Sequence, residues 1–244
     1  MRNIRLYTNM KKLVYLLSFV VFTFVLVGCQ SNEDKANKLI KDYMFKHLHD
    51  FKSYEVVETK LDTLYDSPFT DLACIQLGED ANEHLTSSTE YDEAAERDND
   101  TMDIWSGGWS STSRKEYSKA YKSWCNNKKK AALERIGYLE VAKQILEKAK
   151  DLNGEEQIGW SVTHTFRSNT LAGNSSLGTK LFYVDKNIKN ILASFDEDDE
   201  DLLPAMSVIT NTITKIATPE HADSLIVGWQ GLVDMYDKDI EKIR

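Results

Sequence analysis

Prolines and cysteines are scarce in this chain, with three of each in 244 residues, and its 39 acidic side chains outnumber the 30 basic ones. So few prolines, together with 41% apolar and 28% charged residues, exclude collagen-like, low-complexity and wholly disordered proteins. The formal net charge of −9 argues against a nucleic-acid binder, which needs a basic face for phosphates. We therefore expect an acidic, helix-rich protein with no nucleic-acid partner.

The first 28 residues differ in composition from the rest of the chain. A basic leader without acidic residues is followed by the uncharged apolar run 13–28, which ends in the small residue Gly28. This run has 16 residues, fewer than the roughly 20 that a membrane-spanning helix needs. A basic leader, an apolar stretch and a small-residue exit are typical of a secretory signal. We predict that residues 1–28 are a signal peptide, with an uncleaved anchor helix as the alternative.

The segment Leu26-Val27-Gly28-Cys29 resembles the lipobox of bacterial lipoprotein precursors. The resemblance implies that Cys29 is acylated and becomes the new N-terminus, so that the lipid joins the protein to a membrane. Removing residues 1–28 takes four positive charges from the formal charge of −9, which leaves −13. Anionic lipid surfaces would repel such a protein, so the acyl chains must provide the anchoring.

The residues after Cys29 bear on localisation. Gln30 stands where an inner-membrane retention signal of the enterobacterial type would place Asp, and this resemblance favours the outer membrane. We assign residues 29–35 as an acidic tether, because Ser31-Asn32-Glu33-Asp34 loosely resembles the tether of surface-exposed lipoproteins of Bacteroidota. Short acidic tethers are also ordinary linkers, so the periplasmic and surface faces both remain open.

The periodicity of apolar residues predicts an α+β fold for residues 36–244, as a single domain. Spacing of 3.6 residues predicts helices over about 33–50, 69–97, 113–150 and 219–244, while alternation and β-branched composition predict strands over about 53–62, 158–167, 178–185 and 188–195. Residues 202–217 suit a helix or a strand. We expect a small antiparallel sheet of three or four strands, a long helical hairpin at about 69–150 inserted after the first strand, and a C-terminal amphipathic helix.

Two stretches resemble uncharacterised lipoproteins of gut Bacteroidales. One is Lys38-Leu39-Ile40-Lys41-Asp42-Tyr43 with the following strand, and the other is the strand 159–167, which has the pattern Gly-Trp-x-Val-x-His-x-aromatic-Arg. The resemblance covers about a third of the chain and implies no activity, since that family has none to transfer.

Catalytic and metal-binding motifs are absent from the sequence. It contains no Gly-x-Ser-x-Gly, Ser-x-x-Lys, phosphate loop or His-Glu-x-x-His, and the acidic run 196–201 lacks the glycine of a calcium loop. We therefore assign no catalytic residue, metal or cofactor. We expect Cys74 and Cys125 to be buried thiols, because hairpin geometry places them too far apart for a disulfide. His164 shares an apolar strand face, so we expect a hydrogen-bonded core histidine.

Aromatic residues cluster between 105 and 124, beside Gly107-Gly108. Tyr117, Tyr121 and Trp124 have helical spacing and are expected to pack inside the hairpin. Trp105 and Trp109 lie on the predicted turn and are our candidate ligand contacts, for a glycan or a protein partner. The leading hypothesis is a lipid-anchored, non-enzymatic binding or interaction module of the cell envelope. The alternative is a glycan or cell-wall hydrolase that uses paired carboxylates such as Glu90 and Asp92, and a third option is a scaffold whose hairpin self-associates.

Overall fold

The computed structural model describes residues 31–197 and 199–243, and these group into two compact units. A sheet unit contains residues 31–62 and 160–192, and a helical unit contains residues 63–159 and 193–243. The predicted signal peptide and Cys29 lie outside the described residues. None of the described helices combines the length and apolar composition needed to cross a membrane.

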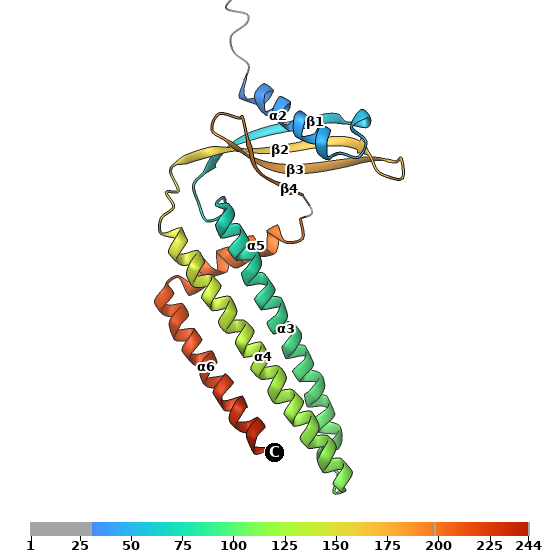
Figure 1. Ribbon diagram of the computed structural model, residues 1–244, viewed down its shortest axis with the longest axis vertical. Coiled ribbons are helices and arrows are strands. Elements are labelled where there is room, and N and C mark those ends of the chain that lie inside the picture. The colour runs from blue at the N-terminus through green and yellow to red at the C-terminus, as the bar shows by residue number, and fades with distance from the viewer. Residues whose placement is uncertain (1–30, 198, 244) are drawn as a thin grey trace, which may run out of the picture. The chain divides into compact units, whose positions relative to one another are not determined.

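The sheet is antiparallel, and its four strands follow one another in the order β1-β2-β3-β4. Its elements, with the helix and short 3-10 turn that precede them, are α2 (Asn32–His47), η1 (Phe51–Ser53), β1 (Glu55–Tyr65), β2 (Gln157–Asn169), β3 (Ser175–Asp185) and β4 (Ile191–Asp196). Strands β1 and β2 are neighbours although the whole helical hairpin lies between them in the sequence (Figure 1). The α+β class and the hairpin insertion after the first strand are therefore confirmed.

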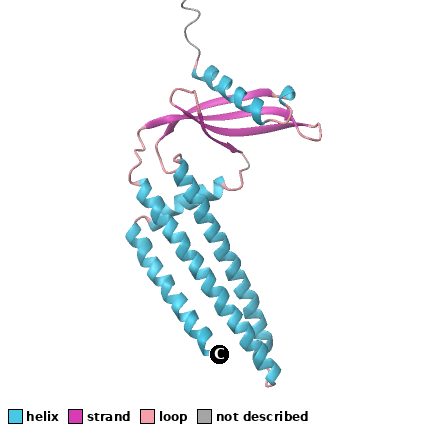
Figure 2. Cartoon of the chain, in the orientation of Figure 1, coloured by secondary structure: helices cyan, strands magenta, loops and turns pink. Residues whose placement is uncertain are grey.

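Helix α2 lies along one face of the sheet (Figure 2). It buries the stripe Ala36, Ile40 and Met44 completely, as the 3.6-residue spacing predicts. The strands supply alternate residues to the same core, which are Val162, Phe166, Phe182 and Val184. This cluster is the hydrophobic core of the sheet unit.

Residues 31–35, within the segment assigned as a tether, are the N-cap and first turn of α2. Ser31 caps α2, because its Oγ accepts a hydrogen bond from the Asp34 N–H at 3.1 Å and its own N–H donates to the Asp34 carboxylate at 3.1 Å. This reciprocal pair is a capping box, and it places Glu33 and Asp34 in the first helical turn. The acidic residues thus begin a helix.

Strand β4 begins at Ile191, three residues later than predicted. Residues 185–190 form the turn, in which the Asp185 carboxylate accepts from the Lys189 N–H at 2.7 Å and from the Asn190 side chain at 2.8 Å. Ile188 adopts a left-handed backbone, with φ of 55°, while its side chain is buried in the core of the sheet unit. Burial of this side chain offsets the backbone strain.

The helical unit is built on two long antiparallel helices. Its elements are α3 (Leu72–Ser106), α4 (Ser111–Ala149), α5 (Leu202–Asn211), the π-helical turn η2 (Thr212–Ile216) and α6 (Pro219–Lys242). Helices α3 and α4 run side by side along their length, and α6 lies along α4 (Figure 1). The predicted hairpin at about 69–150 and the C-terminal helix are confirmed, and in the ambiguous segment 202–217 residues 202–216 are helical.

Close approach of the helices depends on glycine at two positions. The His84 ring of α3 lies over Gly137 of α4, where an added Cβ would come within 2.6 Å of the ring. Gly78 of α3 faces Ala205 of α5, where a Cβ would come within 2.9 Å of the Ala205 carbonyl. These contacts bring α3 against both neighbours.

The described residues form more than one hydrophobic cluster. Helices α4 and α6 bury a cluster of their own, around Leu139, Leu146 and Ala222, and a second cluster joins Cys74, Ile145 and Ile209. Both are separate from the core under α2. The helical hairpin is therefore part of a unit with its own hydrophobic core, because α5 and α6 cover apolar faces that the hairpin cannot bury alone.

Candidate functional site

The turn that joins α3 to α4 exposes one large aromatic side chain. Trp109 is 96% exposed, and Ile104 before it is 75% exposed. Trp105 is only partly exposed, because α3 continues through it to Ser106. The structure thus separates the two candidate contacts, leaving Trp109 in solvent and Trp105 on the last helical turn.

Hydrogen bonds and close packing hold this turn in place. Ser110 caps α4, its Oγ accepting from the Ser113 N–H at 3.0 Å, and the Gly108 N–H donates to the Trp105 carbonyl at 3.3 Å. A Cβ on Gly108 would come within 2.3 Å of the Ser113 Cβ, so only glycine fits. A hollow of about 440 Å³ lies beside Trp109, lined by Ser106, Gly107, Gly108, Trp109 and Arg114. We call these residues with Ile104 the hairpin tip.

The turn is shorter than the sequence indicated. We expected residues 98–113 to be irregular, but only 107–110 separate the two helices. Asp98 accepts a hydrogen bond from the Asn127 side chain of α4 at 2.8 Å. Such cross-helix pairing lets the polar segment continue as helix despite its turn-like composition.

Two other aromatic residues of the cluster, Tyr121 and Trp124, contact α6 instead of the hairpin interior. Trp124 meets Tyr236 edge to face at 5.6 Å between ring centroids, and Tyr121 stacks on Trp124. The Tyr121 hydroxyl donates to Asp239 at 3.4 Å. Tyr117, which we also expected in the hairpin core, is 41% exposed. Helical spacing thus correctly indicated packing for Tyr121 and Trp124, although their partner is the C-terminal helix, and it was wrong for Tyr117.

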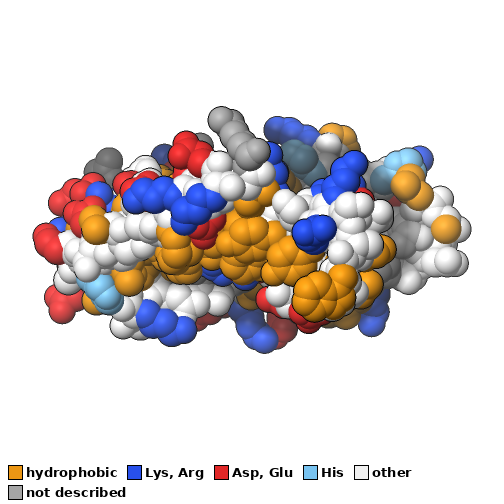
Figure 3. Space-filling view, turned by 90° about the horizontal axis from the view of Figure 1, so that it is seen from below, with side chains coloured by type: hydrophobic (Ala, Val, Ile, Leu, Met, Phe, Trp, Pro, Cys, Tyr) orange, Lys and Arg blue, Asp and Glu red, His pale blue; other side chains and the backbone are white. Residues whose placement is uncertain are grey.

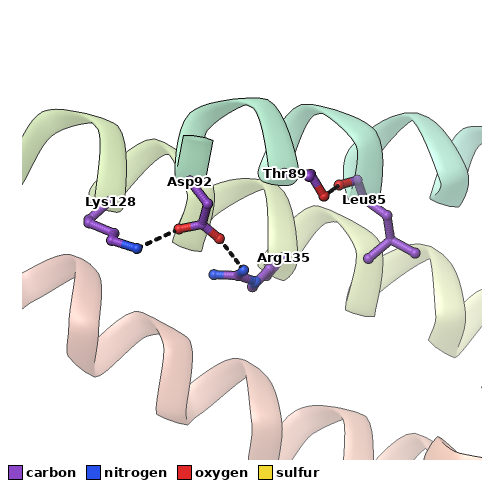
Figure 4. A network of polar contacts seen from close by, with 5 residues as sticks. All are labelled: Leu85, Thr89, Asp92, Lys128 and Arg135. Carbon is purple, nitrogen blue, oxygen red and sulfur yellow. Dashed lines mark hydrogen bonds and ion pairs between the residues drawn. The ribbon is translucent and has the colours of Figure 1, made fainter. Parts of the chain in front are cut away.

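Of the two carboxylates proposed for a hydrolase, Asp92 is already paired with basic side chains. Asp92 is held by two cations of α4, since Lys128 donates to it at 2.9 Å and Arg135 donates to its other oxygen (Figure 4). Burial alone would raise the pKa of Asp92, but these hydrogen bonds and charges leave that pKa below its usual value. Asp92 is therefore ionised and cannot act as a general acid, while Glu90 is exposed on the helix surface.

The two described cysteines are free and fully buried. Burial, with the nearby Asp71 carboxylate, raises the pKa of Cys74 to about 11, and burial also raises the pKa of Cys125. Both side chains are therefore protonated thiols, and neither is an activated nucleophile. This confirms that they form no disulfide.

His164 is completely buried and lies in a chain of hydrogen bonds. The Thr59 hydroxyl donates its proton to the Asn37 side-chain oxygen at 2.6 Å. The Thr59 oxygen is therefore the acceptor of the hydrogen bond from the His164 Nδ1–H, at 2.8 Å. Nε2 is then unprotonated and accepts from the Tyr54 hydroxyl at 2.7 Å. Burial lowers the pKa of His164 to about 4 and raises that of Tyr54 to about 12. The predicted core histidine is confirmed, and it is neutral.

Asp199, in the acidic run 196–201, accepts hydrogen bonds at the start of a helix. The Asp199 carboxylate accepts from the backbone N–H groups of Asp201 and Leu202, each at 3.1 Å, at the start of α5. Burial, together with Asp201 and Asp199, raises the pKa of Glu79. Over residues 31–197 and 199–243, no three His, Cys, Asp or Glu side chains are placed to hold a metal ion.

A second hollow, of about 350 Å³, lies among the helices of the helical unit. Its lining comes from every helix of that unit and consists of Leu85, Arg135, Tyr138, Leu139, Asn211, Lys215, Ile216, Leu225 and Trp229. Sequence analysis missed these residues because they are far apart in the chain and share no motif.

Within the described residues, the hairpin tip and this second hollow are our two candidate binding features. Comparisons with protein-family models, with curated proteins and with solved structures find no match to this chain.

Proposed function

We propose that this protein is a lipid-anchored component of the bacterial cell envelope, held at the outer membrane through Cys29, and that it acts as a non-enzymatic binding module. The hairpin tip is its contact with a glycan or protein partner. The observation that carries the proposal is Trp109, which is 96% exposed on a turn fixed between two long helices.

An exposed tryptophan at a helix–helix turn has no role in packing. The turn is already closed by the Ser110 cap and by Gly108, so it does not need an indole. Exposed aromatic side chains are enriched in binding surfaces, and tryptophan contributes about 2 kcal/mol or more at an interface hot spot. A flat ring beside hydroxyl groups also suits stacking on a sugar ring, and Ser106 and Ser110 supply hydroxyls here.

Two further observations favour binding over hydrolysis or nucleic-acid recognition. Asp92 is ionised and paired with Lys128 and Arg135, so this carboxylate is not available as a general acid. On the face in Figure 3, hydrophobic side chains gather across the middle and charged side chains of both signs border them. The basic side chains seen there are interspersed with acidic ones, whereas a phosphate backbone requires a basic surface.

The tip is tested by replacing Trp109 with alanine in the mature protein. We expect the free energy of unfolding to change by less than about 0.5 kcal/mol, because the side chain packs against nothing. Binding should fall by tenfold or more when the protein is screened against arrays of purified envelope polysaccharides and envelope proteins.

Trp124→Ala is the matched control, since Trp124 stacks between α4 and α6. This variant should lose about 1 to 3 kcal/mol of stability and keep the ligand. The proposal fails if Trp109→Ala melts as early as Trp124→Ala, or if every hit of the parent binds Trp109→Ala equally well.

The anchor is tested by replacing Cys29 with alanine in cells fed a clickable palmitate analogue. The parent should carry the label, fractionate with the outer membrane, and have the mass of residues 29–244 plus acyl chains. Cys29→Ala should lose both the label and that mass. Cys125→Ala is the control and should keep the label, because Cys125 is buried. Labelling of Cys29→Ala at the parent level would overturn the lipid anchor.

A further inference from the structure

The second hollow has a composition that points to a class of small molecule. Aliphatic side chains and two aromatic rings form most of its wall, namely Leu85, Tyr138, Leu139, Ile216, Leu225 and Trp229. Ligand sites are typically apolar concavities with a few polar groups that fix orientation. At about 350 Å³ the hollow is at the small end of such sites.

Both charged residues that line the hollow are cations. They are Arg135 of α4 and Lys215 of η2, and no Asp or Glu is among the described residues that line it. This is unexpected in a chain with a formal charge of −9. An apolar wall with only positive charge complements a molecule that has an apolar body and a negative head.

Arg135 already interacts with other protein side chains, and Lys215 makes no ion pair among the described residues. The Arg135 guanidinium stacks over the Trp229 ring, with its Cζ 4.6 Å from the ring centroid, and it donates to Asp92 (Figure 4). Asp92 is shared with Lys128, so two positive charges face one negative charge there. Lys215 is exposed and makes no ion pair within the described part of the chain. Its ammonium group is therefore available to a ligand.

The turn that carries Lys215 has an unusual backbone. η2 is a π-helical turn, and the residue after it, Ala217, has a left-handed backbone with φ of 64°. Thr212 in the same turn is completely buried, and its hydroxyl finds no hydrogen-bond partner in the described residues. π-helical turns and unsatisfied buried groups are costly and are frequently found at functional sites. Here the turn brings Lys215 and Ile216 to the hollow.

We propose that this hollow binds an amphiphilic carboxylate, with the apolar body against Leu139, Ile216 and Trp229 and the carboxylate on Lys215. The volume corresponds to on the order of a dozen non-hydrogen atoms, at about 30 Å³ each. A straight-chain carboxylate of medium length has this size. The site lies within the helical unit and is independent of the hairpin tip.

The probe is decanoate, added to the mature protein below the concentration at which it forms micelles and followed by protein NMR. We expect saturable binding at one site, with a dissociation constant of roughly 0.1 to 3 mM for a ligand of this size. Decanol has the same chain without the charge and should bind at least fivefold more weakly. Acetate has the charge without the chain and should not bind.

Variants of Lys215 test the head-group contact. Lys215→Gln should weaken decanoate about fivefold to tenfold, and Lys215→Glu should abolish its binding. Lys238→Gln, at an exposed lysine of α6 that does not line the hollow, should bind like the parent. Because Lys215 is exposed, these variants should keep the parent melting temperature.

Any one of three results would overturn the proposal. These are the absence of saturable decanoate binding up to about 10 mM, an affinity for decanol equal to that for decanoate, and an affinity of Lys215→Gln for decanoate equal to that of the parent. Trp109→Ala separates this proposal from the function proposed for the tip. It should bind decanoate like the parent, and a loss there would show that the probe binds at the tip instead.

Discussion

Replacing Phe182 with alanine should lower the free energy of unfolding of the sheet unit by about 3 to 5 kcal/mol. Phe182 has no exposed surface and lies in β3, with the ring of Tyr43 against it edge to face at 5.3 Å between centroids. The alanine variant would leave a cavity between α2 and the sheet that neighbouring side chains cannot fill. Amide hydrogen exchange over β2 and β3 measures the loss without contributions from the helical unit.

Two variants in the same sheet calibrate this result. Leu177→Ala, in β3 where Leu177 is 60% exposed, should change stability by less than about 0.5 kcal/mol. Trp160→Ala should cost about 1 to 2 kcal/mol, because Trp160 is only partly buried and its indole N–H donates to the Lys186 carbonyl at 3.2 Å. If Phe182→Ala exchanged no faster than Leu177→Ala, the cluster under α2 would not be the core of this unit.

The sequence predicted the local elements well where one periodicity continues without interruption. In β2 the alternation of Val162, His164 and Phe166 with polar residues correctly identified both the strand and its buried face. The stripe of α2 behaved in the same way. Trp160 follows the same alternation but is only half-buried, and it packs against the outside of the buried cluster. Periodicity therefore predicts which face of the strand a side chain lies on, but not how completely that side chain is buried.

Contacts between segments that are far apart in the chain could not be predicted from the sequence. Trp124 was correctly expected to pack, but the neighbouring sequence does not indicate that Tyr236 is its partner. The separation into two units depends on how α5 and α6 cover the hairpin, and the hollow around Lys215 depends on the π-helical turn. Such features arise from tertiary packing, which local propensity does not encode.

Lowering the pH from 6.5 to 4.5 should destabilise the sheet unit through His164. Burial holds the pKa of His164 at about 4 in the folded protein, against about 6.5 when the chain is unfolded. Between these values the unfolded state binds the proton and the folded state does not, so stability is lost as the pH falls through this window. The slope is up to about 1.4 kcal/mol per pH unit, and the total loss is on the order of 2 to 3 kcal/mol.

The carboxylates of the sheet unit affect stability in a different pH range. Hydrogen bonds to Asp185 and Asp50 lower their pKa values, so their contribution is present above pH 4 and is lost only below it. The interval from 6.5 to 4.5 therefore isolates the histidine. Urea unfolding followed by hydrogen exchange over β2, at several pH values, measures the slope.

His164→Gln removes the titrating group and keeps a neutral polar side chain. This variant should be less stable at pH 7, because glutamine cannot reproduce both hydrogen bonds, to Tyr54 and to Thr59, but its stability should be flat between pH 6.5 and 4.5. His49→Gln, at an exposed histidine in the same unit, should keep the parent slope. A slope that survives in His164→Gln would contradict this account. So would an NMR titration that placed the pKa of His164 near 6.5, because a histidine that charges freely cannot lie in a chain where Tyr54 donates to its Nε2.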